Sequence, residues 1–382
     1  MTQNPTREIT LPMNNTATVA APAVIPTVTS ETVFEDSVVA NPVVYLDARD
    51  IKEWVSLDET LDTWSEQIKL QQLRDVEDVE TQTLFLRDSG DAALQRQGGK
   101  QAVAYTLTAM RHLCALVGEG ERNTAGVLCR TAKPKNSRPP LFQDIVQGNP
   151  NREVTLRIAR DLATGRPVVR AFVSDRHSLS SGDDTALIAA IRQFQGLAQD
   201  ARARYVRGWD HTRAELVCGE TIQIRPGLGI KLRAYFQNSE TKACSFGAAA
   251  GAYLTFTGTP VTLPFSGERN KARHLDSKCE IAMTGAVERA LTDMHNVANL
   301  FDRACGKEVN VGEMLQAAVD SMGLKDDAAA AVALTAAMVP EAVPANTLAF
   351  VVVALSLFTR YAKDADQAFD AEATAGFLLS KV

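Results

Sequence analysis

The chain is poor in the cysteine patterns that mark a metal site or a secreted scaffold. It has six cysteines, Cys114, Cys129, Cys218, Cys244, Cys279 and Cys305. None forms a C-x-x-C pair, whereas zinc sites use close cysteine pairs and disulfide scaffolds pack more cysteines into a shorter chain. The spacing therefore predicts reduced, mostly buried thiols in a cytoplasmic protein.

The chain also lacks the short motifs that identify common chemistries. It contains no phosphate-binding G-x-x-x-x-G-K-[ST] loop, no G-x-S-x-G elbow and no H-E-x-x-H, and its five histidines are scattered. The two glycines of "RPGLGIK" have no third glycine at the dinucleotide spacing. We therefore predict no catalytic residue, no metal site and no cofactor. We lean against an enzyme without excluding one, because active sites assemble in space.

Long apolar runs are missing too. The longest, "LAFVVVALSLF" from Leu348 to Phe358, is too short to span a bilayer and predicts a buried helix. The first residues, "MTQNPTREITLPMNN", lack the basic-then-apolar order of a signal peptide. No membrane partner is expected.

The net charge of −6 hides a strong asymmetry along the chain. Ser30 to Gln95 carries 16 acidic and 5 basic side chains, and Arg122 to Tyr235 carries 10 acidic and 19 basic. From Gly306 to the end there are 10 acidic and 5 basic. A basic middle can present one positive face to a polyanion, or it can simply pair with the acidic segments.

These patterns predict a mixed α+β fold with a central, largely antiparallel sheet, packed helices and a helical C-terminal region. We divide the chain into a disordered tail (1–40), an acidic helical region (41–118), a basic loop (119–151), a basic α+β domain (152–306) and an Ala-rich helical region (307–382). In the acidic region, Ser56 and Glu59 form a capping box before Leu57, Leu61, Trp64 and Ile68, which repeat at helical spacing.

The basic domain shows the clearest strand patterns. "VTLRIAR" and "VVRAFVS" read as a hairpin around the turn "DLATGRP". A helix follows from Asp184, and we extend its pattern through "QDARARYVRG", with Arg202, Arg204 and Arg207 near its C-terminal end.

In "GIKLRAYFQN", Lys231, Arg233 and Tyr235 alternate with apolar residues. Proteins that bind single-stranded nucleic acid use cations to contact the phosphates and aromatic rings to stack on the bases. Any β-strand with one solvent-exposed face can show the same pattern. The loop "SGERNKARHLD" before the next helix is a second candidate anion site. The predicted nucleic-acid-binding residues are Arg166, Arg170, Arg176, Lys231, Arg233, Tyr235, Arg269, Lys271, Arg273 and His274.

Two stretches carry a family resemblance. "RAFVSD" from Arg170 and "NSE" from Asn238 resemble an R-A-F-x-S segment and an N-S-x-x-G turn of an uncharacterised family common in phages, prophages and plasmids, known as domain of unknown function nine hundred and thirty-two. His177 stands where that family more usually has tyrosine, and Lys242 and Ala243 replace its glycine. The resemblance covers about Arg152 to Leu379. It implies a mobile-element protein located in the host cytoplasm, with no settled activity.

Two functions follow as expectations. The first is single-stranded DNA binding or annealing in recombination or replication, as a monomer or a homo-oligomer. The second is a non-enzymatic phage accessory or assembly protein that acts on phage or host proteins. In that case the acidic helix over Leu57–Ile68 and the Ala-rich C-terminal helices form the interfaces.

Overall fold

The structure is a computed structural model. It describes residues 38–39, 54–80, 84–86, 92–96, 99–106, 108–109, 112, 153–173, 184–241, 246–265, 271–272, 279–362 and 365–382. The chain divides into two units, Met1–Val33 and Phe34–Val382. The first unit lies outside the described residues, as does the predicted tail apart from Val38–Val39 and the predicted basic loop 119–151.

The larger described sheet is antiparallel and runs in the order β15-β14-β13-β11-β10-β2, with β12 and β16 pairing β13 and β14. Its strands are β2 (Val55–Ser56), β10 (Arg202–Arg207), β11 (Thr212–Val217), β12 (Ile222–Arg225), β13 (Leu228–Asn238), β14 (Phe246–Leu254), β15 (Thr259–Thr262) and β16 (Lys271–Ala272). The pattern of "GIKLRAYFQN" thus correctly predicted a strand. The segment Arg202–Arg207, which we expected to continue a helix, instead forms β10 and pairs with β11.

A second sheet runs in the order β1-β7-β9-β8-β3, and a small meander in the order β4-β5-β6. Their strands are β1 (Val38–Val39), β3 (Arg74–Glu80), β4 (Leu84–Leu86), β5 (Ala92–Arg96), β6 (Gly99–Ala102), β7 (Ala104–Thr106), β8 (Glu153–Arg160) and β9 (Pro167–Val173). The predicted hairpin is confirmed as β8 and β9, and its turn uses Gly165 at φ 71°, where only glycine is unstrained. The expectation of a helical region over 41–118 is wrong for Arg74–Thr106, whose described residues form strands.

The described helices are α1 (Leu57–Gln71), α5 (Asp184–Phe194), α6 (Cys279–Asp293), α7 (Val297–Gly306), α8 (Val311–Ser321), α9 (Asp326–Ala336), α10 (Leu348–Phe358) and α11 (Ala365–Leu379), with short 3₁₀ turns at Gln195–Ala198 and Met294–Asn296. The start of α1 agrees with the capping prediction, because the Glu59 amide donates to Ser56 Oγ. The apolar run Leu348–Phe358 is the buried helix α10.

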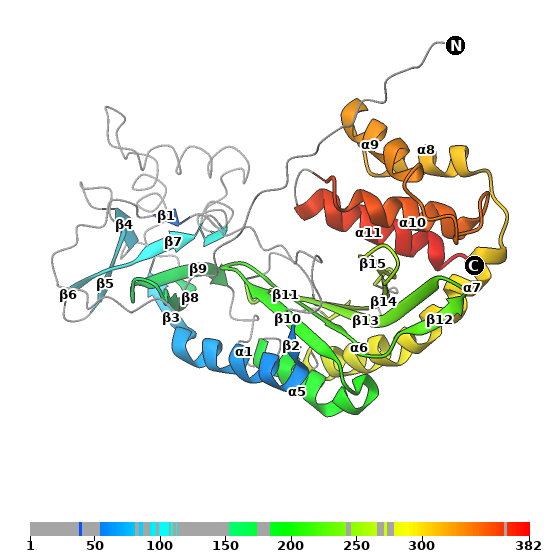
Figure 1. Ribbon diagram of the computed structural model, residues 1–382. Coiled ribbons are helices and arrows are strands. Elements are labelled where there is room, and N and C mark those ends of the chain that lie inside the picture. Colours follow the sequence, from blue (N-terminus) through cyan, green and yellow to red (C-terminus); the bar gives the residue numbers. More distant parts are fainter. Residues whose placement is uncertain are drawn as a thin grey trace, which may run out of the picture. The chain divides into compact units, whose positions relative to one another are not determined.

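The larger sheet is covered on both faces. Figure 1 shows α5 and α6 along one side of the strands and α10 and α11 on the other, and α6 contacts β13 and β14 while α10 and α11 contact β15. One continuous apolar core runs from α1 through the sheet to α11. The fold is therefore α+β with a largely antiparallel sheet and a helical C-terminal region, as the patterning predicted. Because helices lie on both faces, a charged side chain that is buried on a central strand needs a partner inside the protein.

Candidate functional site

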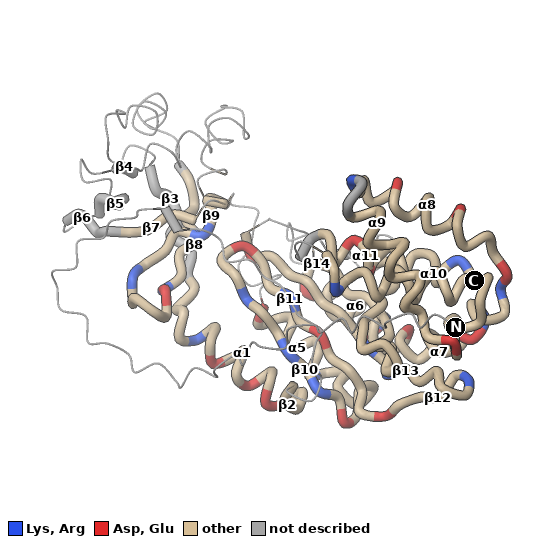
Figure 2. Tube along the Cα trace, turned by 45° about the horizontal axis from the view of Figure 1, so that its top comes forward, with Lys and Arg blue, Asp and Glu red and all other residues tan. Residues whose placement is uncertain are grey.

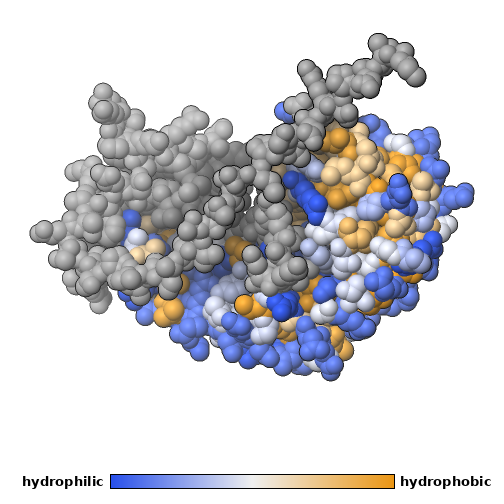
Figure 3. Space-filling view, in the orientation of Figure 1, coloured by the Kyte–Doolittle hydropathy of each residue, from blue (hydrophilic) through white to orange (hydrophobic). Residues whose placement is uncertain are grey.

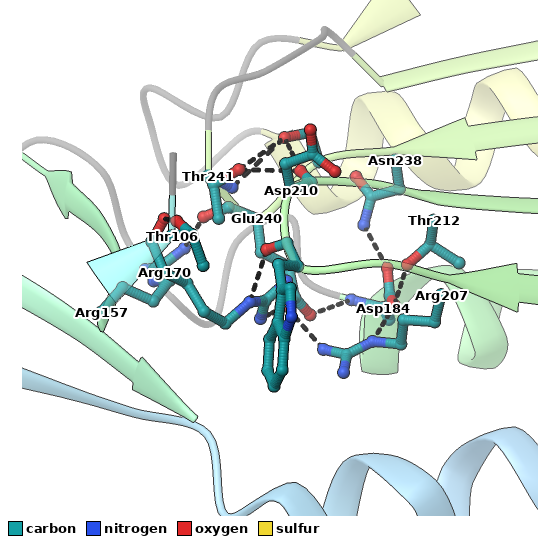
Figure 4. Close-up of polar contacts among 12 residues, drawn as sticks. Thr106, Arg157, Arg170, Asp184, Arg207, Asp210, Thr212, Asn238, Glu240 and Thr241 are labelled. Atoms are coloured by element: carbon teal, nitrogen blue, oxygen red, sulfur yellow. Dashed lines mark hydrogen bonds and ion pairs between the residues drawn. The ribbon is translucent and has the colours of Figure 1, made fainter. Parts of the chain in front are cut away.

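Charged side chains are buried where the ends of β9, β10 and β13 meet the start of α5 (Figure 4). We call this group the junction cluster, which consists of Arg170, Asp184, Arg207 and Glu240. Two guanidinium groups face two carboxylates, and Arg170, Asp184 and Glu240 have 1%, 0% and 2% exposed surface. The group carries no net charge.

Glu240 is the acceptor that joins the two sheets. Its Oε2 atom lies 2.5 Å from Nη1 of Arg170 on β9 and 2.7 Å from Nη2 of Arg207 on β10. Its Oε1 atom accepts from the backbone amide of Asp184 at 3.2 Å, and its backbone carbonyl accepts from Arg157 on β8. Burial alone would raise the pKa of Glu240, but the charges of Arg207 and Arg170 outweigh burial and lower that pKa.

Asp184 collects the remaining donors at the N-terminus of α5. Its Oδ2 atom accepts from Arg207 Nε at 2.7 Å, from Thr212 Oγ1 at 2.7 Å and from Trp64 Nε1 at 3.3 Å. Its Oδ1 atom accepts from Asn238 Nδ2 at 2.8 Å. This one carboxylate therefore connects strands β10, β11 and β13 with helices α1 and α5. It lies at the N-terminus of α5, where the helix dipole favours negative charge.

The hairpin that joins β10 to β11 is tied to the same place. The hydroxyls of Ser239 and Thr241 both donate to the backbone carbonyl of Asp210, at 2.6 and 2.7 Å. Nε of Arg170 donates to the carbonyl of Trp209 at 2.7 Å. The short segment after β13 therefore holds this hairpin by its backbone.

A second buried group, the sheet–helix cluster, consists of Arg204, Glu215, Arg233 and Glu372. Glu215 on β11 accepts from Nε of Arg204 at 2.6 Å and from Nε of Arg233 at 2.6 Å. Arg233 also pairs with Glu372 on α11, and both contact Thr262 on β15. Burial would raise the pKa of Glu215, but Arg233 and Arg204 outweigh it and lower that pKa. This cluster fastens the C-terminal helix to the sheet.

Three of the predicted nucleic-acid-binding residues lie inside the protein. Arg170 and Arg233 are 1% and 2% exposed and are neutralised by carboxylates, and Tyr235 is 3% exposed. The Tyr235 ring packs against Phe369 and Phe265, with ring centroids 5.3 and 6.2 Å away. The expectation that these side chains present an open binding face is wrong. Helix α11 covers the face of β13 that carries Arg233 and Tyr235, and Arg170 on β9 is enclosed in the junction cluster.

Two others are half-buried and make local contacts. Nη2 of Arg166 donates to the carbonyl of Val103 at 3.3 Å, and Nζ of Lys231 donates to the carbonyl of Gly219 at 2.7 Å. Of Lys271 the structure describes the backbone, in β16. The remaining predicted residues lie outside the described residues: Arg176, Arg269, Arg273 and His274.

The described charges do not gather into one basic surface. Figure 2 shows basic and acidic positions interspersed along the described strands and helices. Several surface arginines are also paired, for example Arg192 with Asp62 and Arg225 with Asp302. The single continuous basic groove that the nucleic-acid hypothesis requires is not formed by the described side chains.

One feature of the sequence does indicate a buried arginine, although the alternating pattern of the strands suggested an exposed one. "PVVRAFV" is a nearly continuous apolar run with one arginine, which is typical of a strand buried on both faces. An arginine in such a run needs a carboxylate inside the fold. Sequence reasoning missed those carboxylates. Glu240 and Glu372 lie far along the chain from Arg170 and Arg233, and Glu215 faces Arg204 only because Arg202–Arg207 forms a strand rather than the expected helix.

The two clusters are suited to holding elements together rather than to acid–base chemistry. A carboxylate whose pKa is lowered by two arginines stays ionised and is a weak proton acceptor. In the described part of the chain, no three or more His, Cys, Asp or Glu side chains are placed to hold a metal ion. Nor does any helix there combine the length and apolar character needed to cross a membrane.

A scan against protein-family models, a search of curated proteins and a search of solved structures each found no match. The resemblance to the phage and plasmid family therefore stays a prediction. The two stretches that carry it do meet in space, since Arg170 bonds Glu240 and Asn238 bonds Asp184 in the junction cluster.

Proposed function

We propose that this chain is a non-enzymatic accessory or assembly protein of a mobile element, which works in the host cytoplasm through protein–protein contacts. The observation that carries this proposal is an exposed apolar surface on the C-terminal helices. Leu334, Met338 and Tyr361 are 57%, 42% and 46% exposed, and the Tyr361 hydroxyl lies 3.3 Å from Met338 Sδ.

This surface is formed by neighbouring residues of the C-terminal helices. Figure 3 shows apolar residues gathered at the end of the molecule where Figure 1 places α9. Contiguous exposed apolar side chains are typical of protein-binding surfaces, whereas single ones are ordinary. By contrast, two of the arginines that favoured a polyanion partner, Arg170 and Arg233, are paired with carboxylates inside the fold.

Site-specific photo-crosslinking tests the proposal. A photoreactive amino acid replaces Leu334 in the full chain, in cells that naturally contain it, and Ile281 is the matched control. Ile281 is 74% exposed but lies on α6. We expect a protein adduct at position 334 and none at position 281. Equal labelling at both positions, or no protein adduct at position 334, would contradict the proposal.

Nucleic-acid binding is the second candidate, and one observation favours it. Lys271 pairs with Gly247 in the sheet, and a Cβ at Gly247 would lie 2.9 Å from the Phe265 ring. The backbone of Lys271, which belongs to a basic stretch of the sequence, therefore lies in the sheet next to a strand position close to a half-buried aromatic ring, and cations together with aromatic rings are what single strands bind.

Fluorescence anisotropy with a single-stranded oligonucleotide tests this second candidate. Binding should weaken with salt, with a log–log slope of about −0.7 per phosphate neutralised. Lys271→Ala should reduce the slope by about one phosphate, whereas Lys325→Ala, an exposed lysine before α9, should not. Binding that is absent at low salt, or insensitive to salt, would remove the candidate.

A further inference from the structure

The two faces of the larger sheet differ in character, and Figure 1 shows α6 and α11 on opposite sides of its strands. On the α6 side, β11 and β13 present Leu216, Leu232 and Phe236, which are buried in the apolar core. The pairing of β10, β11 and β13 places the alternate residues on the other side. We call this side the α11 face, which consists of Arg202, Arg204, Arg213, Glu215, Arg233 and Tyr235. Arginines therefore outnumber carboxylates on it, and α11 covers a basic surface rather than an apolar one.

Helix α11 contacts this face with two side chains that lie one helical turn apart. Glu372 pairs with Arg233. The ring of Phe369 lies 5.3 Å from the Tyr235 ring and 5.5 Å from the guanidinium carbon of Arg213. A nucleotide of a single strand offers the same two groups, a phosphate for arginine and a flat ring for stacking. The helix thus makes, with its own side chains, the contacts that a single strand would make on this face.

The packing of α11 on the sheet is also less apolar than the packing of α6. Helix α6 buries the large apolar side chains of Met283, Val287 and Leu291. Besides Leu379 and Glu372, α11 buries small residues, namely Ala368, Ala371, Ala375 and Gly376. Small side chains remove little apolar surface from water, and a buried ion pair contributes little net stability because both charges lose their hydration. The contact between α11 and the α11 face is therefore of a kind that another anion can replace.

We infer that α11 is a displaceable cover of the α11 face, and that single-stranded nucleic acid is the ligand that displaces it. Phosphates would take the place of the Glu372 carboxylate on Arg233, and a base would take the place of the Phe369 ring on Tyr235. The inference goes beyond the protein-binding surface at Leu334 and does not rest on it. In the closed chain the apparent affinity for nucleic acid is reduced to the fraction of molecules in which α11 has moved away.

Fluorescence anisotropy of a labelled oligothymidylate tests this competition in the full chain. Glu372→Gln removes the carboxylate that competes for Arg233, so this variant should bind about tenfold more tightly than wild type. Asp302→Asn is the control, since it raises the net charge by the same amount but breaks a surface pair with Arg225, and it should bind like wild type. Thermal unfolding checks that each variant is folded. Equal affinities of the two variants would overturn the inference.

Two phenylalanines of α11 test the ring contact. Phe369 lies against the α11 face, whereas Phe377 on the same helix is 49% exposed. Phe369→Ala should strengthen binding of the oligothymidylate, and Phe377→Ala should not. If the two changes have the same effect, α11 does not compete through its ring.

The salt dependence of binding locates the phosphates. Arg213→Gln, added to Glu372→Gln, should weaken the tighter binding and lower the log–log salt slope by about one phosphate. Lys271→Ala, added to Glu372→Gln in the same way, should leave the gain in affinity from Glu372→Gln unchanged. A gain that depends on Lys271 and not on Arg213 would place the nucleic acid elsewhere and overturn the inference.

Hydrogen–deuterium exchange of the wild-type chain gives a result even if Glu372→Gln does not fold. Saturating oligothymidylate should speed the exchange of amides in α11, while those of α6, on the opposite side of the sheet, should exchange as before. Binding without faster exchange in α11 overturns the inference, and so does an absence of binding by the wild type and every folded variant. A protein adduct at position 334 would support the proposed function in either case, so the two proposals can fail separately.

Discussion

The sheet region and the C-terminal helices invert the usual distribution of charge. In the sheet region, Arg157 and Arg170 are among the largest fully buried side chains, and both clusters pair arginines with carboxylates inside the protein. In the C-terminal helices, Leu334 is more than half exposed on a helix with no polar face. One region hides charge and the other displays apolar surface.

This difference shows that whether a side chain is buried depends more on the partners available to it than on its residue type. Buried arginine is tolerated where two strands and a helix end bring carboxylates within hydrogen-bond distance. Exposed leucine is tolerated singly, but a stripe of exposed apolar residues calls for a covering surface. The buried arginines are paired with carboxylates inside the chain, whereas no described element covers Leu334 and Met338 on α9.

The largest expected effect comes from unbalancing the junction cluster. Glu240→Gln keeps the shape but leaves Arg170 and Arg207 without a full counter-charge on that side. Removing one partner of a buried ion pair costs about 3–5 kcal/mol. We expect the free energy of unfolding, measured by urea denaturation, to fall by that amount.

The matched control is Asp62→Asn, which breaks the pair with Arg192 at the same 2.5 Å separation but at the surface. Exposed pairs contribute about 0–1 kcal/mol, so this variant should stay close to wild type. If both variants lost the same small amount of unfolding free energy, the buried ion pairs of the junction cluster would contribute no more to stability than an exposed pair.

The second prediction concerns the close packing of α11 against the sheet. A Cβ at Gly376 would lie 1.7 Å from the carbonyl oxygen of Thr262, and backbone cannot move aside as a flexible side chain can. Gly376→Ala should lift α11, strain the contact between Glu372 and Arg233, and lower the free energy of unfolding by about 1–3 kcal/mol. Gly306→Ala is the control, because nothing lies within 4 Å of a Cβ there. A loss that is no larger at Gly376 than at Gly306 would mean that the close approach is not needed.

Local patterns predicted individual elements well. The capping box, the hairpin of β8 and β9, the strand β13 and the buried helix α10 were all readable, because each depends on residues close in the chain. The class of the fold followed from the same patterns.

The failed predictions concern contacts that the local residue pattern does not specify. The alternation of β13 predicted a wet face for Arg233 and Tyr235, yet a helix more than a hundred residues later in the chain covers that face. Arg204 and Arg207 were assigned to a helix because their run continued a helical pattern, and pairing with β11 decided otherwise. Alternation shows which residues share a face, but not whether a later segment covers it.

Acid should weaken the two buried clusters. Glu215 and Glu240 have pKa values lowered from 4.5 in the folded chain, so they stabilise it above pH 4.5 and lose that contribution as the pH falls. Each additional proton bound on unfolding changes the free energy by about 1.4 kcal/mol per pH unit.

Urea denaturation between pH 7 and pH 3 measures this dependence. Glu215→Gln should be less stable at pH 7 but should show a shallower decline with acid, because one of the titrating groups is gone. An unchanged slope in Glu215→Gln would show that the cluster does not cause the acid sensitivity.

The smallest expected change in stability comes from a comparison of two buried hydroxyl groups in the sheet region, one with a hydrogen-bond partner and one without. The Tyr235 hydroxyl is buried and has no hydrogen-bond partner among the described residues, whereas the Thr212 hydroxyl donates to Asp184 at 2.7 Å. Tyr235→Phe removes a desolvated group and keeps the ring that packs on Phe369, so the protein should be as stable as wild type or more stable by up to about 1 kcal/mol. Thr212→Val removes a bond to a charged acceptor and should cost about 1.5–3 kcal/mol. If Tyr235→Phe instead proves the more damaging change, the hydroxyl has a partner in solution, and the face beneath α11 is wetter than its burial implies.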